Sequence, residues 1–89
     1  MIGDTLSTLL VTGGGRGIGA ATARLAAARG YAVCVNYRSD ETAAQSVVDG
    51  IRAAGGSALA VRADISSETE VVTLFDAAER ALGPLRGLV

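Results

Sequence analysis

The sequence contains no lysine, no histidine and no tryptophan, and it has a single cysteine, Cys34. One cysteine cannot form an intrachain disulfide, and it has no second cysteine or histidine with which to bind a metal ion, so we expect no metal site. Cys34 lies between Val33 and Val35. This apolar setting favours a small buried residue over a reactive thiol.

Neither sign of charge is in large excess. The net charge is −1, and no run of like charges occurs along the 89 residues. Neither a nucleic-acid-binding surface nor a polybasic membrane patch is therefore expected. No apolar run approaches the length of a membrane span. The first residues, 1–4, carry no basic segment followed by an apolar one, so we expect no signal peptide and a cytoplasmic location.

Short apolar segments alternate with segments of helical periodicity. The expected strands are 6–12, 32–37, 57–62 and a fourth that begins at 85 and ends with the sequence. Helical patterns fill the intervals. This alternation predicts an α/β fold, with a doubly wound parallel sheet and right-handed crossovers. Strands that are apolar throughout fit a sheet that is covered on both faces.

Each expected helix has an apolar stripe, which we expect to face the sheet. The stripes are Ile18, Ala21 or Thr22, Leu25 and Ala26; then Ala44, Val47, Val48 and Ile51; then Val71, Leu74, Phe75, Ala78 and Leu82. Ser39 is the expected N-cap of the second helix. Ser67 and Glu70 have the spacing of a capping box at the start of the third.

A glycine-rich loop joins the first strand to the first helix: Thr12-Gly13-Gly14-Gly15-Arg16-Gly17-Ile18-Gly19. Glycines there permit a tight turn, a close approach of the backbone to a pyrophosphate, and close packing of the helix on the sheet. A surface turn would explain the glycines alone, but their place between a strand and a helix favours dinucleotide binding. No lysine follows them, which excludes a Walker A loop. The predicted contacts are Gly13, Gly15, Arg16, Gly17, Ile18 and Gly19.

The tip of the second strand indicates which dinucleotide is bound. NAD sites usually carry an acid about 20 residues beyond the loop, for the ribose 2′-hydroxyl. Here Arg38 lies 21 positions beyond Gly17. An arginine there can bind the 2′-phosphate of NADP, and Arg16 can approach it from the other side. Each alone could be a solvated surface charge, but the two together predict NADP rather than NAD, with contacts from Asn36, Tyr37, Arg38 and Ser39.

Asp64 and Ile65 follow the third strand. Asp64 is placed to accept a hydrogen bond from the adenine amino group, and Ile65 to pack on the face of the ring. The simpler interpretation is a turn aspartate that leads into the cap of the next helix. Both interpretations stay open on the sequence.

These residues resemble the short-chain dehydrogenase/reductase family, in its short form. Thr12, Gly13, Gly17 and Gly19 match the family's Thr-Gly-x-x-x-Gly-x-Gly loop. The segments 36–39 and 64–65 and the closing Leu85-x-x-Leu88-Val89 are also similar to family sequences. The expected structure is the N-terminal part of a Rossmann fold, with strand order 3-2-1-4 and a truncated fourth strand.

The resemblance implies hydride transfer between a nicotinamide and a small-molecule carbonyl or alcohol substrate. The family performs the acid–base work with a Tyr-x-x-x-Lys pair and a serine, supported by an asparagine. This sequence has no lysine, and both its tyrosines, Tyr31 and Tyr37, lie too early. We therefore predict no catalytic residue here, and interpret residues 1–89 as a partial dinucleotide-binding domain of an enzyme that the resemblance implies is a homotetramer.

Two alternatives remain. The chain could be a nucleotide-binding fragment that catalyses nothing. It could also belong to another class of nucleotide binder, such as the methyltransferases that use S-adenosylmethionine. A methyltransferase would be expected to carry an acid at the tip of the second strand, where this chain has Asn36, Tyr37 and Arg38.

Overall fold

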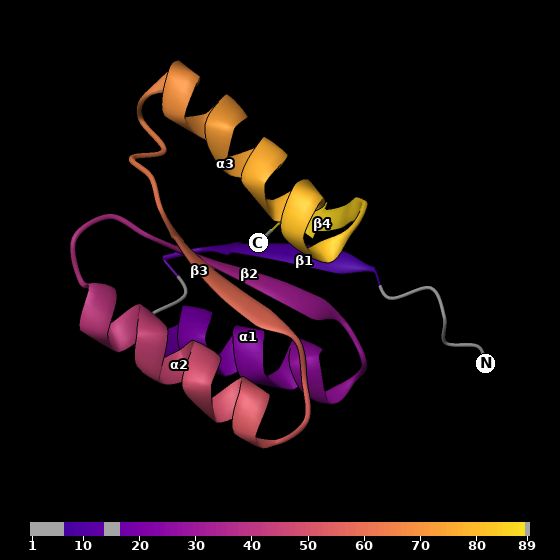
Figure 1. Cartoon of the computed structure of the whole chain (residues 1–89). Helices are drawn as coiled ribbons and strands as arrows, with labels where there is room; N and C mark the ends of the chain where they lie inside the picture. Colours follow the sequence, from indigo (N-terminus) through magenta and orange to yellow (C-terminus); the bar gives the residue numbers. More distant parts are fainter. Residues whose placement is uncertain (1–6, 14–16, 89) are drawn as a thin grey trace.

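Strands and helices alternate in the computed structural model, which describes residues 7–13 and 17–88. The elements are β1 (Thr8–Thr12), α1 (Gly17–Ala28), β2 (Ala32–Tyr37), α2 (Glu41–Ala53), β3 (Ala58–Arg62), α3 (Glu68–Leu82) and β4 (Leu85–Leu88). The strands form one parallel sheet of order β3-β2-β1-β4. Helices α1 and α2 cover one face, and α3 covers the other (Figure 1). The expected α/β class and strand order are confirmed.

The second strand is one of the two inner strands of the sheet. It pairs with β1 on one side and with β3 on the other, and its residues 32–36 are all buried. Successive side chains of a strand point to opposite faces. Val33 and Val35 accordingly pack in the cluster beneath α1 and α2, whereas Cys34 packs with Leu74 beneath α3. Burial on both faces is why this strand is apolar without alternation.

The face of α1 that meets the sheet differs from the predicted one. Ala20, Ala23 and Ala26 are buried, whereas Ile18 is 86% exposed and Leu25 is 57% exposed. Of the predicted stripe, only Ala26 is buried in the core. The prediction that Ile18 and Leu25 face the sheet was wrong. Alanines spaced three apart let a helix lie close to a sheet, and the bulky side chains are left on the outer side.

The apolar stripes of the other two helices are confirmed. All four predicted residues of α2 are buried: Ala44, Val47, Val48 and Ile51. In α3, Leu74 and Ala78 are buried, Phe75 and Leu82 pack against them, and Val71 is half-buried. Among the described residues, no helix combines the length and the apolar character that a membrane crossing requires.

The helix caps were predicted less well. The N-cap of α2 is Asp40, whose carboxylate accepts a hydrogen bond from the Ala43 amide at 3.0 Å, and not Ser39. The N-cap of α3 is Ser67, as predicted. Only half of the capping box forms, because the Glu70 carboxylate accepts a hydrogen bond from the Asp64 amide instead of the Ser67 amide. Aspartate is as good an N-cap as serine, so local chemistry did not decide between neighbours.

Leu74 and Val72 provide a test of this packing, because they lie two positions apart on α3 and differ in exposure. Leu74 is fully buried against the sheet, and Val72 is 65% exposed. We expect Leu74→Ala to lower the free energy of unfolding by about 2–5 kcal/mol, because it removes apolar contacts and leaves a cavity. Val72→Ala should change it by less than about 0.5 kcal/mol. Urea denaturation of both variants checks this, and equal losses would contradict the assigned face of α3.

Cys34 provides a second test, of burial beneath α3. Burial raises the pKa of its thiol from 9.0 to about 11. Because the folded state disfavours the thiolate, the stability that the neutral thiol contributes is present below pH 9 and is lost as the pH rises through about 11. At pH 8 we expect a thiol reagent to label Cys34 far more slowly in the folded protein than in urea. Equal labelling rates would contradict its burial.

Candidate functional site

The parallel sheet brings the described members of the predicted site to one edge. Thr12 pairs with Asn36, and Tyr37 pairs with Arg62, so β1, β2 and β3 end close together. The glycine loop, the 38–40 segment and the 63–67 segment leave the sheet at this carboxyl edge. In open α/β sheets, ligands bind in the crevice outside the carboxyl ends of the strands. The topology thus gathers three separate parts of the sequence into one candidate site.

Two glycines frame the loop after β1. Gly13 has φ = +64° and Gly17 has φ = +53°. Both values lie in the left-handed region, where a residue with a Cβ atom is strained. Gly15 and Arg16 lie outside the described residues. The loop therefore requires glycine at both of its described ends for conformational reasons.

The loop leads directly into α1, which begins at Gly17. The first turn of the helix contains no acidic residue. Its amide groups and partial positive charge are thus not offset by a carboxylate of the helix itself, which is the arrangement that anions prefer. Ile18 projects into solvent from this turn, and Gly19 is half-buried behind it.

Asn36 has a structural role that the sequence did not reveal. Its side chain is buried, and its Nδ2 atom lies within hydrogen-bonding distance of the carbonyl oxygens of Val61 (3.3 Å) and Ala63 (3.1 Å). The Ala63 amide in turn donates to the Tyr37 carbonyl at 2.9 Å. These contacts fasten the end of β2 to the end of β3. The signal in the sequence was an amide inside an apolar strand, since a buried polar group needs a partner.

The neighbours of Asn36 are arranged differently. Tyr37 is half-buried and packs against the core beneath α1 and α2. Arg38 and Ser39 are exposed beyond the end of the strand. Contacts between these residues and a cofactor stay predictions, but Arg38 and Ser39 have the accessibility that such contacts need.

Arg38 faces Asp64 across the gap between the ends of β2 and β3. The Arg38 Nε atom and the Asp64 Oδ2 atom are 4.0 Å apart, and the two side chains are 78% and 32% exposed. This distance is too long for a hydrogen bond, so the two groups interact through their charges. Arg38, the predicted contact of the 2′-phosphate, therefore interacts with Asp64, the predicted contact of the adenine.

Asp64 is held by the turn that follows it. Its Oδ1 atom accepts hydrogen bonds from the Ser66 hydroxyl at 2.7 Å and from the Ser66 amide at 2.9 Å. These bonds, with smaller contributions from the charges of Arg38 and Arg62, hold the pKa of the Asp64 carboxyl below its ordinary value. The carboxylate is therefore charged throughout the physiological pH range.

Glu70 adds a further restraint. Its Oε1 atom accepts a hydrogen bond from the Asp64 amide at 2.9 Å, so both the backbone and the side chain of Asp64 are fixed. Beside Asp64, Ile65 exposes more than half of its surface. Ile65 and Ile18 are thus two large apolar side chains left in solvent at the carboxyl edge.

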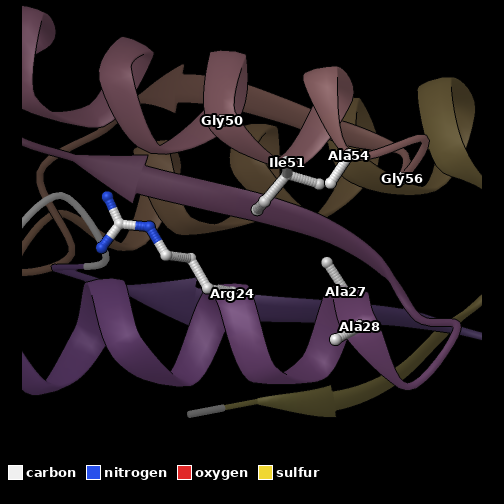
Figure 2. A pocket seen from close by; sticks show the side chains of 7 residues that line it. All are labelled: Arg24, Ala27, Ala28, Gly50, Ile51, Ala54 and Gly56. Atoms are coloured by element: carbon white, nitrogen blue, oxygen red, sulfur yellow. The ribbon is translucent and has the colours of Figure 1, made fainter.

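A separate pocket of about 240 Å³ lies between α1 and α2 (Figure 2). Small and apolar residues from the C-terminal halves of the two helices form most of its lining, and Arg24 extends along one side. None of the predicted site residues lines it. Within the described ranges, no group of acidic, cysteine or histidine side chains is arranged to hold a metal ion.

Comparison with known proteins decides the family. The family model described as "short chain dehydrogenase" matches residues 7–89. This chain belongs to the short-chain dehydrogenase family. That membership agrees with the resemblance seen in the glycine loop and excludes the methyltransferase alternative.

Similar proteins support the assignment of this short-chain dehydrogenase chain. The uncharacterized oxidoreductase YgfF of Escherichia coli is 50% identical over 84 residues, which are 94% of this chain and 34% of that protein. A dehydrogenase/reductase from Sinorhizobium meliloti superimposes with a TM-score of 0.89 at 43% identity, covering 92% of this chain and 32% of the other. A short chain dehydrogenase from Burkholderia cenocepacia, in complex with NADP, superimposes with a TM-score of 0.88 at 43% identity. The match covers 92% of this chain and 34% of the other. The chain thus spans about a third of the length of these relatives.

The Asn36 contacts can be tested by substitution. We expect Asn36→Ala to lower the free energy of unfolding by about 1–3 kcal/mol, because the Val61 and Ala63 carbonyls lose a buried donor. Gln45→Ala is the control, since among the described residues the Gln45 amide bonds only to Asp49, on the exposed side of α2. Denaturant titration should show little change in the control. An Asn36→Ala variant as stable as the parent would contradict this role.

Proposed function

We propose that the protein carrying this chain is an NADP-preferring oxidoreductase, which transfers a hydride between the cofactor and a carbonyl or alcohol substrate. Residues 1–89 would form part of its dinucleotide-binding domain. The observation that carries the cofactor choice is the exposed Arg38 side chain beyond the end of β2, where NAD-binding chains usually carry an acid.

The loop after β1 fits the pyrophosphate of such a cofactor. Gly13 and Gly17 adopt left-handed conformations that favour glycine, they place no Cβ atom on the backbone of the loop, and the N-terminus of α1 follows immediately. We propose that Gly13, Gly15, Gly17, Ile18 and Gly19 line the pyrophosphate, with backbone amides as the donors. Exposure of Ile18 in the first turn supports this, since a bound cofactor would cover it.

The turn after β3 fits the adenine ring. Ile65 offers an exposed apolar surface, and Asp64 offers a fixed carboxylate. We propose that Ile65 packs on the ring and that Asp64 accepts a hydrogen bond from the adenine amino group. Asn36 and Tyr37 would support this edge from within the fold, and Ser39 would contact the ribose side from solvent.

The 2′-phosphate is the group for which Arg38 is suited. A guanidinium binds phosphate with charge-assisted and potentially bidentate hydrogen bonds. The solved Burkholderia cenocepacia relative is a complex with NADP, which supports NADP binding here. Arg16 is proposed as a second contact with this phosphate.

When bound, the cofactor supplies or accepts the hydride at its nicotinamide ring. This chain's own residues would bind and orient the adenosine and phosphate half. The tyrosine, lysine, serine and asparagine that perform the acid–base work in the family have no counterparts among these 89 residues. We propose that these four residues lie elsewhere in the protein that carries this chain. The same proposal includes a homotetrameric assembly and a cytoplasmic location.

The alternative is a nucleotide-binding unit without catalysis of its own. The intact mass of the natural protein separates the two first, because a mass near 8.9 kDa leaves no room for the missing catalytic groups. For a larger protein, NADPH oxidation in the presence of carbonyl compounds is the second test. Tight NADPH binding with no turnover on any carbonyl compound would favour the alternative.

Replacing Arg38 tests the cofactor choice. We expect Arg38→Glu to weaken NADPH binding by about ten- to a hundredfold, because one charge-assisted contact contributes about 1.5–3 kcal/mol. NADH binding should hold or improve, since the new carboxylate can accept a hydrogen bond from the ribose 2′-hydroxyl. Quenching or enhancement of the cofactor's fluorescence measures both dissociation constants.

Arg29→Glu is the matched control for that experiment. It makes the same change in charge at an exposed residue just beyond the C-terminal end of α1, which is the end away from the glycine loop. We expect it to alter both affinities by a similar small factor. If Arg38→Glu left the affinity for NADPH unchanged, the proposed role of the strand tip would be wrong.

A further inference from the structure

We infer that Asp64 is a positioning residue for Arg38, which holds the guanidinium over the end of β2 so that its donors meet a 2′-phosphate. The inference rests on the proposed function and adds a second residue to the cofactor preference. Its basis is that the two side chains face each other at 4.0 Å between Nε and Oδ2, although their strands end in separate loops.

Asp64 is suited to act as a fixed point. Its Oδ1 atom is occupied by two hydrogen bonds from Ser66, and its backbone amide is bound by Glu70. Only Oδ2 is turned toward Arg38. An aspartate with two hydrogen bonds to its carboxylate and one from its backbone amide imposes its position on a flexible partner, and not the reverse.

Arg38 is suited to be positioned. Its side chain is 78% exposed, so without a partner it would sample many rotamers, and binding would have to order it. The distance to Asp64 is longer than a hydrogen bond, so the attraction orients the guanidinium without occupying its N–H donors. Those donors stay available for a phosphate.

A simple charge argument predicts the opposite sign. A carboxylate near a phosphate site repels the phosphate, so removing it should strengthen binding of a 2′-phosphorylated nucleotide. Positioning predicts that removing it weakens such binding. The two mechanisms are therefore separated by whether removing the Asp64 charge strengthens or weakens binding of a 2′-phosphorylated nucleotide.

Asp64→Asn is the decisive variant. The asparagine keeps an Oδ1 atom to accept the Ser66 hydrogen bonds, and it loses the charge that attracts Arg38. Adenosine 2′,5′-bisphosphate and adenosine 5′-monophosphate are the probes, because they share the adenine and differ in the 2′-phosphate. Calorimetric titration of the complete encoded protein gives the ratio of their affinities. An effect on the adenine contact changes both affinities and cancels in that ratio.

We expect Asp64→Asn to lower the preference for the 2′-phosphate by about two- to fivefold, the range of exposed ion pairs. In an Arg38→Ala background the same substitution should leave the ratio unchanged or raise it, because only repulsion remains. Asp76→Asn is the control, since Asp76 forms a similar exposed pair with the Nε atom of Arg80 on α3. It should leave the ratio unchanged.

The outcomes separate this inference from the proposed function. If the parent protein does not prefer the 2′-phosphate, or Arg38→Ala does not reduce that preference, the proposed function fails. If Arg38→Ala reduces it and Asp64→Asn leaves it unchanged or raises it, the function stands and the positioning role is overturned. A loss with Asp64→Asn that persists in the Arg38→Ala background would also overturn it, because the effect would not act through Arg38.

Discussion

The parallel pairing of β2 with both of its neighbours is the constraint on which the rest of this structure depends. Its residues 32–36 are buried on both faces, so the strand is stable only when helices cover the sheet above and below. The two core clusters meet this need with α1 and α2 on one face and α3 on the other. Parallel pairing also requires each crossover to return the chain to the same end of the sheet, and it therefore places three strand ends at one edge.

That edge is organised by polar contacts between residues distant in sequence. Asn36 joins the end of β2 to the carbonyls around the end of β3, and the Asp64 carboxylate is fixed by Ser66. Glu70 adds a bond from the first turn of α3 to the Asp64 backbone. The consequence is that Asp64, which faces the exposed Arg38 side chain, is held by hydrogen bonds in a candidate site otherwise built from loops. Such support is what a binding residue on a loop needs, because ordering a flexible side chain opposes binding.

The candidate site at the carboxyl edge and the pocket of Figure 2 differ in the residues that line them. The pocket between α1 and α2 is lined mostly by small apolar residues, with few groups to orient a ligand. The carboxyl edge is open, but it combines apolar surface at Ile18 and Ile65 with the charges of Arg38 and Asp64. Recognition of a nucleotide requires both kinds of contact, one for the ring and one for the phosphates.

Much of this could be predicted from the sequence because it is local. A short apolar run located β2 at 32–37, and the helical period of the apolar residues located the buried faces of α2 and α3. The order of glycines between a strand and a helix indicated the loop, and the resemblance indicated the strand order. Predictions failed where neighbouring residues were chemically equivalent, as with Asp40 and Ser39, either of which could serve as the N-cap of α2. The sequence also favoured the large residues of α1 for the core, because hydrophobicity scales do not register how closely a helix approaches a sheet.

By itself, the sequence determined the alternation of strands and helices, the conformational need for glycine after β1, and the presence of arginine where an acid is usual. Those properties depend on residue type and on spacing along the chain. Only the tertiary structure decided that alanines form the inner face of α1, that the Asn36 Nδ2 atom joins the ends of two strands, and that Arg38 faces Asp64. These follow from the sheet register and the approach of layers, which bring together residues that are distant in sequence, such as Asn36 and Val61.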